Sequence, residues 1–511
     1  MEKNKQLAVN MISQIISFTV SVGISFFLTP FIVKSVGSAA YGFVGLAYDF
    51  VGYAQIATVA LNSMAGRFIT ISLHQEKYDD LNKYFTSVIM ANAAISVVLT
   101  IPFVIILLML DKIVNVPGNI LTDVTLLWGF VFLNFLLSIM GSVFSIAAFS
   151  KNRLDLTSFA SLKSTILKAV ILVIAFYFFK PSLWYIGLAT VICTMYSAGM
   201  NISYTKKLLP YVETNKKYFD FQTIKILLSS GVWNSFTELS SIMSNGLDLL
   251  ITNLFIGAAA MGSMAISKTL PTMILSVFAM LAGVFSPQLT IAYAKNDTEG
   301  MQSQLISSIK ILGIFSCIPM AILFAYGDVF YGLWVPSQNA RLLQTLSILA
   351  CLAFVFVLPL EGLWNIFTVT NKVKQSSIFL FVNSVFTIAI VLIAMKFTKD
   401  INMRLYIVAG TSTVFSIIRA LTFLPLYGAR CLNLKWATFY PVILKNFLAV
   451  GIITAISFWI KHFIYIDSWI MLILAGIITT IISLALNSVL ILGKTERMML
   501  TGMAAKKFNR Q

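Results

Sequence analysis

Ionisable side chains inside long apolar runs are the residues of this sequence best suited to chemistry. Four carboxylates interrupt such runs, namely Asp49, Glu238, Asp248 and Glu361. Four basic residues do the same, namely Lys163, Lys168, Lys268 and Arg419. An ionisable group in a bilayer costs at least about 2.5–3.5 kcal/mol on insertion scales, so each must face a cavity or a partner. The basic set can contact an anionic ligand as it crosses a membrane.

The four carboxylates have a second potential role. Burial in a cavity favours the protonated form of a carboxyl group, so each can serve as a proton or sodium coupling site. Nothing in the sequence ranks the four. The alternative is structural, because internal acid–base pairs can simply hold helices together.

Other kinds of site are not expected. Two histidines lie far apart, at positions 74 and 462, and four cysteines are scattered without a paired or CxxC spacing. No phosphate-binding glycine loop or Ser/His/Asp arrangement lies in a loop that can hold an active site. We therefore expect no catalytic residue, no metal site and no bound cofactor apart from a coupling ion.

Composition identifies the environment of these charges. Of 511 residues, 59% are hydrophobic and 11% are charged, and the mean hydropathy is +0.90. Most apolar runs are longer than about 18 residues, enough to cross a hydrocarbon core as helices, and they lack the alternation of barrel strands. The expected fold class is therefore an all-α polytopic membrane protein.

The apolar runs predict about fourteen transmembrane helices. The first six are expected at 10–33, 41–62, 84–110, 122–148, 157–179 and 182–204. The next six are expected at 223–256, 262–292, 303–327, 341–368, 374–397 and 403–427. Two more are expected at 438–461 and 468–492.

A repeated glycine link predicts two similar halves. The link Val36–Gly42 recurs as Ile256–Gly262, with Gly37 and Gly42 matched by Gly257 and Gly262 at a spacing of 220 residues. Both halves would start from the same side, which indicates parallel repeats and a substrate path between them. The expected domains are a six-helix bundle, a link, a second six-helix bundle, and two extra helices with a basic tail, at 1–208, 209–222, 223–428 and 429–511.

The basic residues of the links set the expected orientation. Of these residues, 22 fall on the side that holds both termini and 8 on the other side. Because cytoplasmic links are enriched in Lys and Arg, both termini are assigned to the cytoplasm. Contact with anionic lipid accounts for most of the net charge of +17, so no nucleic-acid partner is needed.

Helix rise separates the intramembrane charges by depth. Asp49, Asp248 and Lys268 fall in the outer half of their helices, and Lys163, Glu361 and Arg419 in the inner half. Asp49 and Lys268 occupy nearly equivalent positions of the two repeats. We therefore expect an Asp49–Lys268 pair between the bundles, with neutralisation of each charge inside its own bundle as the alternative.

The chain resembles Wzx-type polysaccharide transporters of the multidrug/oligosaccharidyl-lipid/polysaccharide (MOP) superfamily over nearly its whole length. The stretches that carry the resemblance are Leu28–Lys34 with Gly37 and Tyr41–Gly42, Asn62–Arg67, Lys206–Pro210, Asp248 with Ile256–Gly257, and Ala265–Lys268. No single stretch is specific. Together they are typical of that family.

The resemblance implies a flippase that moves an undecaprenyl-diphosphate-linked oligosaccharide to the outer leaflet of a bacterial inner membrane by alternating access. It implies Arg67, Lys268 and Arg419 as contacts of the diphosphate or of acidic sugars. The implied partners are the lipid-linked oligosaccharide, membrane lipids, and the polymerase and glycosyltransferases of the same pathway. No covalent chemistry is implied, so the protein would be a transporter and not an enzyme.

Three alternatives stay open at this point. A lipid II flippase is less favoured, because the first helix lacks a midmembrane arginine. A cation-coupled multidrug exporter is disfavoured by the many basic residues and by fourteen helices in place of the usual twelve. A membrane scaffold for glycan assembly, without transport, is the third.

Overall fold

The computed structural model describes residues 2–370 and 372–493, which form helices and loops without any β-strand. The first half of the chain contains α1 (Glu2–Val36), α2 (Ser38–His74), α3 (Tyr78–Leu108), α4 (Leu110–Ile113), α5 (Leu121–Ser142), α6 (Ile146–Ser150), α7 (Leu154–Phe178), α8 (Trp184–Leu208), α9 (Phe221–Ser241) and α10 (Asp248–Phe255). The second half contains α11 (Ala258–Gly283), α12 (Ser286–Ala294), α13 (Thr298–Trp334), α14 (Ala340–Cys351), α15 (Phe354–Leu360), α16 (Trp364–Val369), α17 (Val373–Phe397), α18 (Ile401–Leu421), α19 (Phe423–Cys431), α20 (Tyr440–Phe463) and α21 (Trp469–Leu490). Short turns of other helix types are η1 (Gly118–Ile120), η2 (Val143–Ser145), η3 (Lys216–Tyr218), η4 (Ile242–Gly246) and η5 (Glu361–Leu363).

The helices agree with the number predicted from the sequence. Within the described residues, 12 helices are long and apolar enough to cross a membrane, and Ala340–Cys351 with Phe354–Val369 adds a span bent by 45°. The helix expected at 223–256 is present as α9, η4 and α10. The prediction of an all-α polytopic membrane protein with about fourteen helices is therefore confirmed.

The chain forms two compact units, of which the first contains Met1–Ala265 and Ser377–Val385. In this unit α5 packs along α8, α2 along α9, and α1 along α7. A buried apolar cluster joins Leu61, Ala65 and Ile69 of α2 to Leu81 and Phe85 of α3. These α2 residues lie four apart, so they share one face of the helix.

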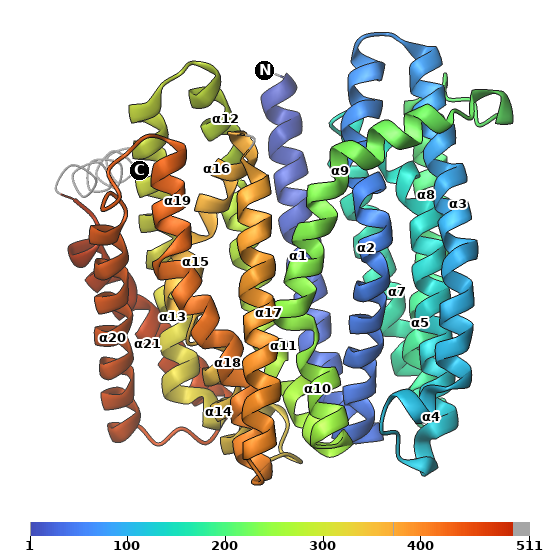
Figure 1. Ribbon diagram of the computed structural model, residues 1–511. Helices are drawn as coiled ribbons and strands as arrows, with labels where there is room; N and C mark the ends of the chain where they lie inside the picture. Colours follow the sequence, from blue (N-terminus) through green and yellow to red (C-terminus); the bar gives the residue numbers. More distant parts are fainter. Residues whose placement is uncertain (1, 371, 494–511) are drawn as a thin grey trace, which may run out of the picture. The chain divides into compact units, whose positions relative to one another are not determined.

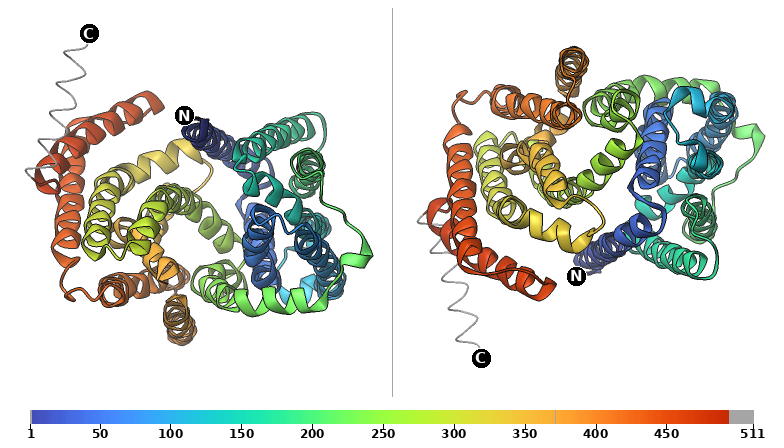
Figure 2. Two further views of the ribbon diagram at one scale, coloured as in Figure 1. Left: turned by 90° about the horizontal axis from the view of Figure 1, so that it is seen from above. Right: turned by 90° about the horizontal axis from the view of Figure 1, so that it is seen from below.

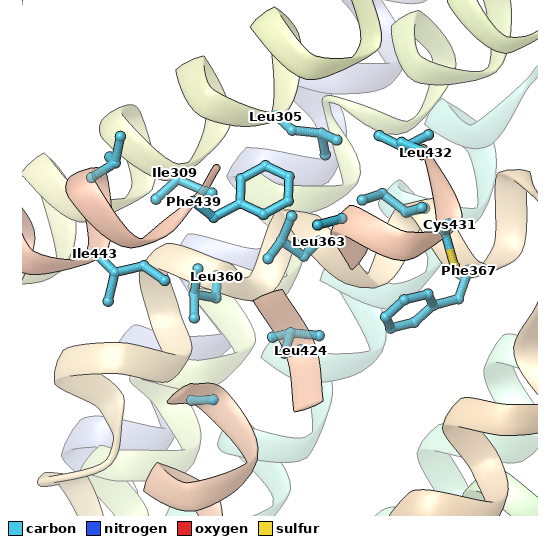
Figure 3. Packing of buried hydrophobic residues seen from close by; sticks show 14 of the residues in the cluster. Leu305, Ile309, Leu360, Leu363, Phe367, Leu424, Cys431, Leu432, Phe439 and Ile443 are labelled. Carbon is cyan, nitrogen blue, oxygen red and sulfur yellow. The ribbon is translucent and has the colours of Figure 1, made fainter. Parts of the chain in front are cut away.

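The second unit contains Ile266–Ser376 and Phe386–Gln511 and is built around α13. Helix α13 contacts α14, α15, α20 and α21, and the end-on views show α20 and α21 beside it (Figure 2). Its core joins Leu305 and Ile309 of α13 to Leu360, Leu424 and Phe439 (Figure 3). These side chains are all nearly inaccessible to solvent.

The repeated glycine link has the backbone that its residues predict. Gly37 and Gly257 have φ angles of 89° and 129°, in the region that favours glycine. The second glycines of the two links lie against each other in the first unit, where a Cβ on Gly262 would lie 2.3 Å from the carbonyl oxygen of Ser38. The two copies of the link thus pack together because neither Gly42 nor Gly262 has a side chain.

The domain limits expected at 208, 222 and 428 stay predictions. The division into two compact units does not show whether the two halves are repeats. Of the residues used for the orientation, five lie outside the described residues, namely Lys494, Arg497, Lys506, Lys507 and Arg510. The assignment of both termini to the cytoplasm also stays a prediction.

Candidate functional site

Helix α2 carries an acid and an aromatic hydroxyl one turn apart, at Asp49 and Tyr53. Both side chains are half-buried in the first unit. The Tyr53 hydroxyl donates a 2.6 Å hydrogen bond to the carbonyl oxygen of Gly246. The ring of Phe50 packs against the Tyr53 ring, with 5.2 Å between their centroids. These contacts fix the orientation of Tyr53 within the first unit.

The residue that accepts this hydrogen bond ends a π-helical turn. The turn η4 covers Ile242–Gly246 and is followed by Asp248, the first residue of α10. Single π turns inside helices are uncommon and occur often at functional sites. Asp49 and Asp248 both lie near enough to Tyr53 to act on it electrostatically. We call Asp49, Tyr53 and Asp248 the acidic group.

Farther along α2, Arg67 lines an open cavity of about 730 Å³ in the first unit. The guanidinium side chain is exposed. Within residues 2–370 and 372–493 it makes no hydrogen bond or ion pair. The other lining residues come from α2, η2, α6 and α7, namely Ser63, Gly66, Thr70, Ile71, Ser145, Ile146, Phe149, Leu154 and Thr157.

The wall of this cavity combines hydroxyl groups with apolar side chains. The Thr70 hydroxyl donates to the carbonyl oxygen of Gly66 at 2.7 Å and lies 2.8 Å from the Ser150 hydroxyl. A ring nitrogen of His74 lies 3.2 Å from the carbonyl oxygen of Ser150. The bonds to Ser150 join the end of α6 to α2 beside the cavity. We call this space the Arg67 cavity.

In the second unit, Glu361 and Arg419 form an electrostatic pair. Both side chains are half-buried, and each charge acts on the other. Glu361 begins the 3-10 turn η5 directly after α15, whose Pro359 interrupts the helical hydrogen bonds. The neighbouring Leu360 is fully buried in the core of this unit (Figure 3). This pairing is compatible with the structural alternative, in which acid–base pairs hold helices together.

The remaining predicted residues are not gathered around one point. Lys163 is exposed and Lys168 is half-buried on α7, where Lys168 lies close enough to Cys193 of α8 to act on it electrostatically. Glu238 is half-buried on α9. Asp49 belongs to the first unit and Lys268 to the second, so their pairing stays a prediction.

Sequence reasoning missed two parts of these sites. Tyr53 was not singled out, although it lies four residues after Asp49 and therefore on the same face of α2. The hydroxyl residues of the Arg67 cavity were also missed. Ser63 and Thr70 are four residues before and three after Arg67, a spacing that places them beside it on the helix.

Comparison with known proteins identifies the family. A family described as polysaccharide biosynthesis protein matches residues 33–334. The uncharacterized membrane protein EpsK of Bacillus subtilis (strain 168) is 28% identical over 496 residues, which cover 96% of this chain and 97% of EpsK. The family match covers more than half of this chain.

Solved structures show the same fold. Lipid II flippase MurJ, in an inward closed conformation, superposes with a TM-score of 0.64 and 15% identity over 93% of this chain and 98% of MurJ. An inward-facing multidrug resistance MATE family transporter of the MOP superfamily gives a TM-score of 0.62 and 14% identity over 84% of this chain and 97% of that chain. The resemblance to Wzx-type transporters of the MOP superfamily is therefore confirmed in family and fold. The chain belongs to the polysaccharide biosynthesis protein family, as a multi-pass membrane protein with the fold of MOP superfamily transporters.

Proposed function

We propose that this protein is a flippase for an undecaprenyl-diphosphate-linked oligosaccharide, the repeat unit of a polysaccharide. It would move the headgroup from the cytoplasmic to the outer leaflet of a bacterial inner membrane by alternating access. Both termini would lie in the cytoplasm, as the basic links predict. The family match and the MOP fold support this function at the level of class.

The Arg67 cavity is the observation that carries the proposal. A guanidinium group binds phosphate oxygens with two parallel hydrogen bonds, and here it has no protein partner within the described residues. The hydroxyl groups of Ser63, Ser145 and Thr157 donate to backbone carbonyl oxygens of their own helices. Their oxygen atoms can still accept hydrogen bonds from sugar hydroxyls in this open cavity. An apolar wall near a single cation suits a headgroup that joins a diphosphate to a glycan.

The acidic group supplies a candidate coupling site for a proton or a sodium ion. A carboxylate held near a second carboxylate favours binding of a cation, because like charges disfavour the doubly ionised state. Asp49 and Asp248 both act on Tyr53, whose hydroxyl is held by Gly246. Glu238 and Glu361 remain further candidates for the coupling ion.

Lys163, Lys168, Lys268 and Arg419 are proposed as further substrate contacts along the path. Arg419 already interacts with Glu361, so it would have to exchange this partner for substrate. The polymerase and glycosyltransferases of the same pathway are proposed partners. Lipid II transport, cation-coupled drug export and a scaffold without transport are the competing functions.

The test uses purified full-length protein in vesicles with a fluorescent undecaprenyl-diphosphate-linked oligosaccharide. Arg67→Ala should lower the translocation rate about 10–100-fold, because hydrogen bonds to a charged group contribute about 1.5–3 kcal/mol. Arg67→Lys keeps the charge without the planar fork, so it should recover only part of the rate. The matched control is Lys83→Ala, which removes an exposed cation paired with Asp80 at 3.9 Å.

The outcomes separate the candidate functions. Wild-type protein that moves labelled lipid II at least as fast would favour the lipid II reading. Export of a cationic drug without movement of the labelled lipid would favour a drug exporter. Absence of any transport by folded protein would support a scaffold, and unchanged translocation by Arg67→Ala would refute the role of the cavity.

A further inference from the structure

The second unit contains an apolar groove with no charged residue in its lining. It has a volume of about 490 Å³ and lies among α14, α17 and α18. Its lining includes Leu349, Leu352, Ile390, Ile407, Gly410 and Val414. Leu352 is 43% exposed and Val414 is 54% exposed, so the groove is open to its surroundings. On a membrane-spanning bundle, an open apolar groove suits the hydrocarbon chain of a lipid.

Two of the three hydroxyl groups that line the groove, those of Thr411 and Thr413, bond to the backbone. The Thr411 hydroxyl donates to the carbonyl oxygen of Ile407 at 2.7 Å. The Thr413 hydroxyl donates to the carbonyl oxygen of Leu349. These two groups are thereby satisfied within the protein. Apart from the hydroxyl of the half-buried Tyr406, the lining is then suited to a hydrocarbon chain and not to a sugar.

One end of the groove is strongly basic. Helix α14 begins one residue before Arg341, α17 carries Lys396 in its last turn, Lys399 lies in the following loop, and α18 carries Arg404 near its start. Figure 1 draws α14 and the junction of α17 with α18 at the same end of the second unit. These four cations are half of the eight that the sequence assigns to the side with fewer basic residues.

A single carboxylate accompanies these cations in the segment 396–404, and it already has a structural role. The Asp400 side chain accepts a 2.7 Å hydrogen bond from the backbone N–H of Met403 and so caps α18. Arg404 donates from Nε to the carbonyl oxygen of Thr398 at 2.7 Å, while Arg341, Lys396 and Lys399 are exposed. The basic end therefore has an excess of positive charge beside the apolar groove.

We propose that this groove binds an anionic phospholipid, with one acyl chain between α14 and α18 and its phosphate near Arg341 and Lys399. Basic pockets between transmembrane helices on the cytoplasmic side are a known type of site for acidic lipid headgroups, and the same charge attraction would act on the opposite side here. Charge complementarity selects an anionic lipid over a neutral one. The volume fits a single acyl chain better than the much longer undecaprenyl chain, so the occupant is distinct from the transported substrate.

Photocrosslinking tests this site in the intact protein. Full-length protein is placed in phosphatidylcholine vesicles that contain phosphatidylglycerol with a photoreactive acyl chain, and crosslinked peptides are identified by mass spectrometry. We expect crosslinks within α18, near Gly410 and Val414. The same photoreactive chain on phosphatidylcholine should label α18 at least about fivefold less, since each basic residue near the surface contributes about 1 kcal/mol to binding an anionic lipid.

Two variants separate the parts of the site. The double variant Arg341→Gln with Lys399→Gln changes only exposed side chains and should lower the preference for phosphatidylglycerol at least about fivefold. Gly410→Leu should fill the groove and reduce labelling by both lipids, since a Cβ at Gly410 meets only Leu349 at 3.7 Å. Gly451→Leu on α20 is the control, because a Cβ there meets nothing within 4 Å.

Three results would overturn the proposal. Equal labelling of α18 by the two lipids in wild-type protein would exclude an anionic site. Full labelling of Gly410→Leu, in protein with a wild-type melting temperature, would place the chain elsewhere. Displacement of phosphatidylglycerol by undecaprenyl phosphate at lower concentration would identify the occupant as the tail of the substrate.

Discussion

Gly262→Ala tests the contact between the two copies of the glycine link. A Cβ at this position would lie 2.3 Å from the carbonyl oxygen of Ser38 and 2.8 Å from the backbone nitrogen of Ala39. Both neighbours are backbone atoms, so α2 would have to move by about 1 Å to restore ordinary contact. No flexible side chain at these atoms can yield in its place.

The size of the effect follows from two opposing contributions. Overpacking of a close contact costs about 1–3 kcal/mol. In a helix, alanine is more stable than glycine by about 0.5–1 kcal/mol, which offsets part of this cost. The net destabilisation should be about 1–2 kcal/mol, which changes the ratio of folded to unfolded protein about 5–30-fold.

The assay is thermal unfolding of purified protein in detergent, followed by loss of helical circular dichroism. Gly42→Ala should have a smaller effect, because its Cβ would meet the flexible Met261 side chain at 2.9 Å and the backbone of Gly262 at 3.0 Å. Gly52→Ala is the control on α2, since a Cβ there meets nothing within 4 Å. A melting temperature of Gly262→Ala equal to or above that of Gly52→Ala would refute the packing argument.

Three further predictions concern contacts outside the glycine links. Asn446→Leu removes a 3.2 Å hydrogen bond from the side-chain amide to the carbonyl oxygen of Ile309, so it should weaken docking of α20 on α13 by about 0.6–2 kcal/mol in a detergent melting experiment. Asn10→Ala should destabilise the protein by about 1–3 kcal/mol in the same assay. The buried Asn10 amide donates to the carbonyl oxygen of Asn152 at 2.9 Å and accepts from the backbone N–H of Asp155 at 3.1 Å. An unchanged melting temperature would contradict this prediction. Asp220 caps α9, and hydrogen bonds, chiefly from the Thr223 hydroxyl, hold its pKa below the ordinary value of 3.8. Its stabilisation is therefore present above pH 3.8 and lost as the pH falls through the lowered pKa, so protease cleavage of the 209–220 link should increase in acid for wild type and much less for Asp220→Ala.

Hydropathy accounts for how well the helices were predicted. A helix across a membrane must form its backbone hydrogen bonds internally and expose apolar side chains to lipid. The length of the apolar run in the sequence therefore predicts the length of the helix. The interrupted spans were predicted as helices, but their breaks were not predicted. The run 223–256 was predicted as one helix, whereas the structure divides it at the π turn Ile242–Gly246.

The positions of the charges in the sequence did not reveal their partners. Asp49 lies one helical turn from Tyr53 on α2, but Asp248 is far from both in the chain, and only the packing of the first unit brings it close enough to act on Tyr53. Glu361 and Arg419 likewise meet through the fold of the second unit. In a membrane, apolar residues face both lipid and neighbouring helices, so the pattern of hydrophobicity says little about which way a helix is rotated.

The sequence by itself determined that this is a helical membrane protein, where its helices lie along the chain, and that the glycine link recurs after 220 residues. The sequence also contains the short stretches from which the family was predicted. The tertiary structure alone decided that Arg67 lines a cavity with hydroxyl groups, and that residues of α14, α17 and α18 together line an apolar groove. Both features depend on side chains from separate helices, and their assembly is set by packing, which no single apolar run encodes.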